Sequence, residues 1–303
     1  MSKKIVALDP LADLYRETLD SCVALWPLFF IRIGFLFLNL AFLVLGLAVC
    51  CWPFLQLLMG HWSDFGTGNV KSWMSEINWM DYFGDFKILI MVGLFAAFYI
   101  TFVGFFLAFF DAAVYCQFNR YQKNGLAFSW RSFFDGGIQK MMPMIGLQCA
   151  WLLAALGVLM GLVFAAVLGV LMEKLLPWWI GLLLAVPFGL AAVLIMLVLG
   201  TGATLSAAYL VDGHGIWDSV KEGTARAIQH KGRAIWANLL MTFIYFIFFM
   251  AFTVVFGALT MIPLIGILFM VFKFLVTSAL AIGFNIYMTS LNVALQLEPK
   301  ESR

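Results

Sequence analysis

Six long apolar segments constrain the fold of this chain more than any other feature. They cover residues 24–57, 88–119, 141–172, 178–211, 236–260 and 267–296. Each is longer than the about 20 residues that a helix needs to cross a bilayer. Because unpaired backbone groups are too costly in hydrocarbon, segments of this kind cross it as helices. We therefore predict an all-α, polytopic membrane protein with six transmembrane helices.

The composition agrees with a membrane protein. Hydrophobic residues make up 64% of the chain and charged residues 11%, against about 45–50% and about 25% in soluble domains. The net charge of +2 is too small to indicate a nucleic-acid partner. There is no linker or low-complexity run, so we predict a single integral membrane domain over residues 1–303.

Basic residues gather in alternate gaps between the apolar segments. They are Lys3, Lys4 and Arg16, then Arg120, Lys123, Arg131 and Lys140, then Lys221, Arg226, Lys231 and Arg233, and finally Lys300 and Arg303. The positive-inside rule then places both termini in the cytoplasm. A polar, acidic stretch follows Lys3 and Lys4 where a signal peptide would have its apolar core, so we expect no cleavable signal.

The boundary between the last two spans has two interpretations. Residues 261–266 include Pro263 and Gly266, which break helices and favour a tight outer turn. Lys273 would then lie inside the sixth helix and extend its ammonium group outward. The alternative places the turn at Lys273, which makes the fifth helix too long.

A short string, Trp-x-Ser-x-x-acid-Gly, precedes both the third and the fifth spans. Its members are Trp130, Ser132, Asp135 and Gly136 in the first copy, and Trp217, Ser219, Glu222 and Gly223 in the second. The common offset predicts an internal duplication, with pseudo-repeats over about 8–119, 125–211 and 213–297. Chance similarity of amphipathic helices is the alternative.

The segments before the first, third and fifth spans are amphipathic at helical spacing. One face carries Ile216, Trp217, Val220, Ala227 and Ile228, and the other Asp218, Glu222, Arg226, Gln229 and Arg233. The earlier segment opposes Trp130, Phe134, Ile138 and Met141 to Arg131, Asp135 and Gln139, and the amino end opposes Leu11, Leu14, Tyr15 and Cys22 to Asp13, Glu17 and Asp20. We predict cytoplasmic interfacial helices in the headgroup layer, whose basic residues attract anionic lipids.

Paired spans that follow such a Gly…Trp-x-Ser-x-x-acid-Gly helix resemble the bacterial membrane families of the YciC type. Those families are related to the membrane domain that precedes some glycerophosphodiester phosphodiesterases. The resemblance implies a six-span helical fold in the bacterial inner membrane. It carries over no catalytic residue, because the chain holds no phosphodiesterase domain.

Besides Lys273, two charged residues lie within the predicted spans. Arg32 and Asp111 fall at similar depth on the cytoplasmic side, and charges at such depth normally pair or face a cavity. We predict an ion pair between neighbouring helices, with an entry to a transport path or unpaired snorkelling as alternatives. Asn285, Asn292 and Gln296 either line a polar path or hydrogen-bond between helices.

The predicted outer gap, residues 58–87, is aromatic and acidic. Its docking candidates are Trp62, Trp73, Trp79 and Tyr82. They either anchor the chain at the outer membrane surface or bind a protein partner.

Small residues recur four apart in the third and fourth spans. They are Gly157, Gly161, Ala165 and Gly169, and Gly181, Ala185 and Gly189. Such stripes let helices approach closely, so they predict either packing of these two helices on each other or contact in a homo-oligomer.

Catalytic motifs are absent from the sequence. His214, Asp218 and Glu222 share a helical face and could bind a metal in principle, but the cations Lys221 and Arg226 lie among them and favour a solvated face. We therefore predict no enzyme activity, no cofactor and no metal. The predicted role is an accessory or organising subunit that contacts membrane lipids and a protein partner or a second copy. The alternative is a small-molecule or lipid transporter or channel, with a polar path near Arg32, Asp111 and Asn285.

Overall fold

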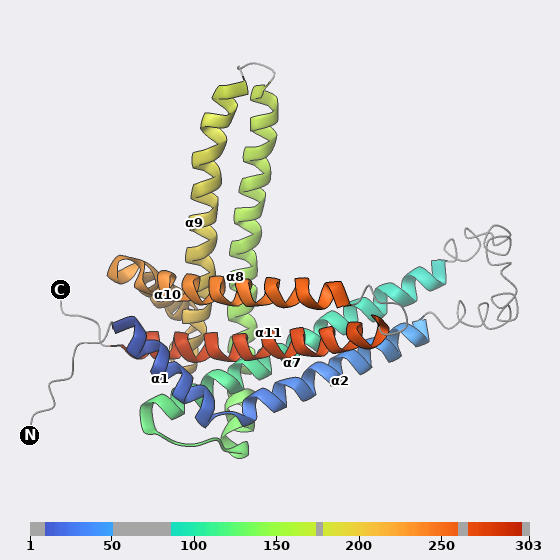
Figure 1. The fold of residues 1–303 in the computed structure, drawn as a ribbon, viewed down its shortest axis with the longest axis vertical. Helices are drawn as coiled ribbons and strands as arrows, with labels where there is room; N and C mark the ends of the chain where they lie inside the picture. Colours follow the sequence, from blue (N-terminus) through green and yellow to red (C-terminus); the bar gives the residue numbers. More distant parts are fainter. Residues whose placement is uncertain (1–9, 51–85, 174–177, 260–265, 299–303) are drawn as a thin grey trace, which may run out of the picture. The chain divides into compact units, whose positions relative to one another are not determined.

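The computed structural model describes residues 10–50, 86–173, 178–259 and 266–298, which are helical apart from short turns (Figure 1). The helices are α1 (Pro10–Ala24), α2 (Pro27–Cys50), α7 (Phe86–Asn124), α8 (Trp130–Glu173), α9 (Trp178–Val211), α10 (Ile216–Leu259) and α11 (Gly266–Leu297). All except α1 are long and apolar enough to cross a membrane. The predicted all-α fold with six long apolar helices is confirmed.

The described parts of the last two long helices lie on either side of the segment in which the sequence predicts a turn. Helix α10 ends at Leu259 and α11 begins at Gly266, and Lys273 lies inside α11. The alternative turn at Lys273 is therefore wrong. Residues 260–265, which would form the outer turn, lie outside the described residues.

The segments predicted as separate interfacial helices begin the long helices instead. Helices α8 and α10 have 44 residues each, which corresponds to about 66 Å at 1.5 Å per residue. This length is about twice the hydrocarbon thickness, so only part of each helix can cross it. Pro143 lies inside α8, where the missing backbone donor favours a bend. By contrast, a turn at Leu25 and Trp26 separates α1 from α2.

The chain divides into two compact units, one of residues 1–30 with 108–303 and one of residues 31–107. In the smaller unit, aromatic rings join α2 to α7. The ring of Phe42 packs among Phe95, Phe98, Tyr99 and Phe102, with centroid distances of 4.9–6.3 Å. A Cβ at Gly46 would lie 1.9 Å from Phe95, so glycine at this position lets the two helices approach.

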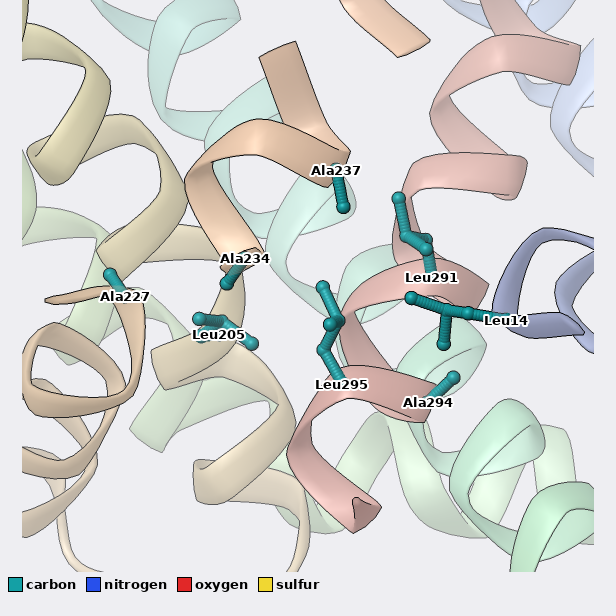
Figure 2. Close-up of a cluster of buried hydrophobic side chains, with 8 residues drawn as sticks. All are labelled: Leu14, Leu205, Ala227, Ala234, Ala237, Leu291, Ala294 and Leu295. Carbon is teal, nitrogen blue, oxygen red and sulfur yellow. The ribbon is translucent and has the colours of Figure 1, made fainter. Parts of the chain in front are cut away.

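In the larger unit, a buried core forms where α1, α9, α10 and α11 meet (Figure 2). It consists of Leu14 from α1, Leu205 from α9, Ala227, Ala234 and Ala237 from α10, and Leu291, Ala294 and Leu295 from α11. Three alanines on one side of α10 let its backbone approach α9 and α11 closely. The core therefore holds the first helix and the last three against one another.

Candidate functional site

The ends of three long helices meet at one carboxylate, that of Asp212, in the turn after α9. The Gln296 amide nitrogen of α11 donates to it at 3.0 Å, and the Asn119 amide nitrogen of α7 donates at 3.4 Å. The Lys123 ammonium of α7 forms an ion pair with the same carboxylate. We call these four residues the Asp212 junction. Gly213, with φ of 107°, permits the tight turn that presents Asp212.

Two opposing effects act on the Asp212 carboxyl group. Partial burial raises its pKa, whereas the hydrogen bond and charge of Lys123, together with the Asn119 and Gln296 amides, lower it. The lowering effects win, so the pKa of Asp212 lies below its ordinary value. The junction therefore holds an ionised carboxylate at neutral pH, and its ion pair ties α7 to the α9–α10 turn.

A buried arginine caps the carboxyl end of α11. Arg226 of α10 is only 4% exposed. Its Nε and Nη2 donate to the Leu295 carbonyl at 3.1 and 2.9 Å, and Nη2 donates to the Glu298 carbonyl at 3.0 Å. The Glu298 carboxylate lies 3.7 Å from Arg226 and 3.0 Å from Arg233. Because the last carbonyls of a helix have no partner within it, Arg226 supplies the donors that α11 lacks.

The prediction that Arg226 lies on a solvated polar face is wrong. Arg226 lies on a buried face of α10 with Ser219, Gly223 and Ala227. Helix α10 contacts α9 and α11. Trp217 and Ile228, assigned to the same apolar face as Ala227, are exposed instead. A single helix pattern does not reveal that a neighbouring helix end offers carbonyl groups to an arginine.

Amide side chains join the helices along this region. Asn238 of α10 and Asn292 of α11 donate to each other, both at 3.2 Å. Gln122 of α7 donates to the Ser290 carbonyl at 3.1 Å. The sequence predicted that Asn285, Asn292 and Gln296 either line a polar path or hydrogen-bond between helices. Asn292 and Gln296 make hydrogen bonds to other elements, whereas Asn285 is exposed.

Helix α1 lies against α11 (Figure 1), and its Leu14 belongs to the core that α10 and α11 share. Tyr15 donates to the Ala237 carbonyl at 3.2 Å, and Tyr287 donates to the Tyr15 carbonyl at 3.3 Å. Ser290 of α11 donates to the Thr18 carbonyl at 3.4 Å. The acidic residues Asp13, Glu17 and Asp20 are exposed. Protein, rather than lipid, therefore covers much of the apolar face of this helix.

The glycine of the repeated string approaches the preceding long helix in both copies. A Cβ at Gly136 would lie 2.8 Å from the Cβ of Cys116 in α7. A Cβ at Gly223 would lie 2.3 Å from the Ser206 hydroxyl and 2.8 Å from the Gly202 carbonyl in α9. The same position of the string thus serves the same packing role twice, while the internal duplication stays a prediction.

The other members of the string lie at the start of each helix. The tryptophans point outward, with Trp130 56% and Trp217 77% exposed. Ser219 is buried and Ser132 is half-buried. Asp135 is exposed and Glu222 half-buried.

Arg32 and Asp111 belong to different compact units. Asp111 is half-buried and accepts a hydrogen bond from the Gln148 amide of α8 at 3.2 Å. Arg32 is half-buried in α2. Their ion pair stays a prediction. The outer docking candidates Trp62, Trp73, Trp79 and Tyr82 lie outside the described residues.

The small-residue stripe does not bring α8 and α9 together at the positions that the structure describes. A Cβ at Gly157 or Gly161 would meet no atom within 4 Å. The predicted contact between α8 and α9 is present, but it does not involve close packing at these two glycines. One close approach lies near Gly202, where a Cβ would lie 3.1 Å from the Trp151 ring.

Among the side chains that the structure describes, no group of three or more His, Cys, Asp or Glu residues is placed to hold a metal ion. His214 lies with its Nδ1 3.1 Å from the Tyr209 carbonyl. Asp218, on the same predicted face, is exposed.

In comparisons with known proteins, no family model, no curated protein and no solved structure matches this chain.

Sequence reasoning missed both Asp212 and Arg226 as organising residues. Asp212 had a usable signal, because it directly follows an apolar span and precedes a Gly-His-Gly sequence that ends the helix. Arg226 had a weaker one: it lies between Gly223 and Ala227, two small residues of a kind that marks a packed face.

Proposed function

We propose that this chain is a non-catalytic protein of the bacterial inner membrane that acts as an organising or accessory subunit of a larger membrane assembly or lipid domain. Its partners would be membrane lipids and either another protein or a second copy of the chain. The resemblance to the YciC-type families supports this proposal through the repeated string alone.

One observation carries the proposal: polar side chains that could have lined a path make contacts between helices. Asn292 bonds to Asn238, Gln296 to Asp212, and Gln148 to Asp111. A transport path needs polar groups that face a cavity and exchange partners with a substrate. Groups already bonded to neighbouring helices are better suited to holding a bundle together.

The proposed orientation, with both termini in the cytoplasm, draws support from the Asp212 junction. It joins the ends of α7, α9 and α11, which are the second, fourth and sixth predicted spans. An even number of spans places these three ends on one side of the membrane, and their basic flanks identify that side as the cytoplasm.

The test compares assembly with flux. The tagged chain, extracted in a mild detergent at native expression, should migrate in a native gel well above its 34.0 kDa mass with a reproducible companion protein. The purified chain in vesicles should leave proton, potassium and chloride leak at the level of empty vesicles. A flux that Asp111→Asn abolishes would overturn the accessory role in favour of a transporter or channel.

A further inference from the structure

The first turns of α8 have three distinct faces. The packed face lies against α7, where Phe133 is buried and a Cβ at Gly137 would lie 2.4 Å from the Phe109 ring. A second face is apolar but exposed, and its residues are Trp130, Phe134 and Ile138, four apart. We call these three residues the first strip. Residues with this spacing lie one above another on a helix, so the strip is continuous.

A polar face borders the first strip on its other side. Arg131, Asp135 and Gln139 are exposed there. Arg131 lies 3.7 Å from Asp135, but their side chains are 93% and 60% exposed, so this pair holds the arginine only weakly. An apolar strip beside an exposed cation matches the boundary between acyl chains and headgroups.

The first turns of α10 repeat this arrangement. Ser219, Gly223 and Ala227 form the packed face. The exposed face carries Trp217, Lys221 and Ile228, which we call the second strip. In both helices a glycine lies against the neighbouring helix, while a tryptophan, a bulky aliphatic residue and a cation face outward.

Continuity with the long apolar helices indicates what covers the strips. Each strip begins a helix that runs without interruption into a segment long and apolar enough to cross the membrane. The first strip lies at the amino end of the candidate span Trp130–Phe164, and the second lies ahead of the candidate span Arg233–Gly257 on the same helix. Tryptophan is favoured where such a helix enters the headgroup layer. A cation beside each tryptophan complements the negative charge of phosphate headgroups.

We propose that the two strips form a contact surface for anionic phospholipid headgroups, with Arg131 and Lys221 as the cations that select them. The inference rests on the proposed placement of both helix starts at the cytoplasmic surface. It deepens the proposed function by naming the lipid class. A protein partner on the same strips is the competing occupant and an outcome of the test.

The first experiment measures depth. Spin labels are placed singly at positions 134, 138, 135 and 139 of a cysteine-free variant in nanodiscs of phosphatidylcholine with 30% phosphatidylglycerol. We expect oxygen to relax labels at 134 and 138 more than a water-soluble nickel complex does, and the reverse at 135 and 139. Equal nickel access at all four positions would overturn the proposal. The same labels are also measured in native membranes. Shielding of positions 134 and 138 from both reagents there is the result expected for a protein partner, and it would overturn the proposal as well.

The second experiment measures lipid selection with the native cysteines in place. Phosphatidylglycerol retained by the protein from mixed nanodiscs is counted by mass spectrometry for Arg131→Gln and Lys221→Gln, with Arg131→Lys and Lys221→Arg as controls that keep the charge. Each lost charge should weaken retention up to about fivefold, and the controls should retain wild-type levels. Retention that stays unchanged in both Gln variants would sink the proposal. Neither result depends on vesicle flux or co-migration, so failure here leaves the accessory role standing.

Discussion

A methyl group added at position 223 would meet atoms that cannot move aside. The new Cβ would lie 2.6 Å from the Ser206 backbone nitrogen and 2.8 Å from the Gly202 carbonyl. We expect Gly223→Ala to lower the free energy of unfolding by about 1–3 kcal/mol, because overpacking forces α9 and α10 apart. Unfolding by SDS in mixed micelles, followed by circular dichroism, measures the loss.

Gly157→Ala is the matched control, since a Cβ there meets nothing within 4 Å. It should leave stability unchanged or raise it by up to about 1 kcal/mol through the helix propensity of alanine. If both alanine variants behaved alike, the close approach of α9 and α10 at Gly223 would be refuted.

Arg226 offers a second test on a single side chain. Arg226→Ala removes the donors to the Leu295 and Glu298 carbonyls, and a buried acceptor left unpaired costs about 1–3 kcal/mol. We expect a loss of that size and faster amide exchange in the last turn of α11. Lys221→Ala, on the exposed face of the same helix, should change stability by less than about 0.5 kcal/mol. Unchanged amide exchange in the last turn of α11 would contradict the role of Arg226 in capping that helix.

At the scale of elements, the Asp212 junction ties α7 and α11 to the α9–α10 turn through one ionised group. The pKa of Asp212 is lowered in the folded protein, against about 3.9 in an unfolded chain. A lowered pKa means that the stabilisation is complete above the unfolded value and disappears as the pH falls through the folded value. The difference in melting temperature between wild type and Asp212→Asn should therefore be constant above about pH 5 and shrink in acid.

Lys123→Met sharpens this test, because it removes the ammonium that lowers the pKa and leaves the burial that raises it. In the methionine background, the contribution of Asp212 should begin to disappear at a higher pH than in wild type. Melting curves from pH 3 to 7 for the four combinations of these variants provide the comparison. Identical pH profiles with and without Lys123 would show that the ion pair does not hold the carboxylate ionised.

The positions of the long helices could be predicted because length and hydropathy alone decide them. The helical position of Lys273 was also predictable, since Pro263 and Gly266 favour a turn ahead of it. Which face of a helix meets protein was not predictable, because both copies of the repeated string expose tryptophan, while the second copy buries its serine and glycine. In a soluble protein the bulky apolar residue would be the buried one, whereas lipid provides no such driving force between helices. Gly157 and Gly161 depart from this pattern, because a Cβ at either position would meet no atom within 4 Å. A stripe of small residues alone therefore does not identify a packed face.

For the whole molecule, the contacts at the helix ends make the membrane topology testable. The Asp212 junction joins the turn after α9 to the ends of α7 and α11. Helix α1 in turn packs on α11. A helix bundle that crosses a bilayer can make such contacts only if these points share one side. We expect fluorescent-protein fusions after residues 127 and 214 and at the carboxyl end to fluoresce. Alkaline phosphatase fusions within 58–87 and 174–177 should be active, because that enzyme folds only where disulfides form. Phosphatase activity at 127 together with fluorescence at 214 would separate the two copies of the repeated string across the membrane, and would remove the basis for a shared cytoplasmic surface.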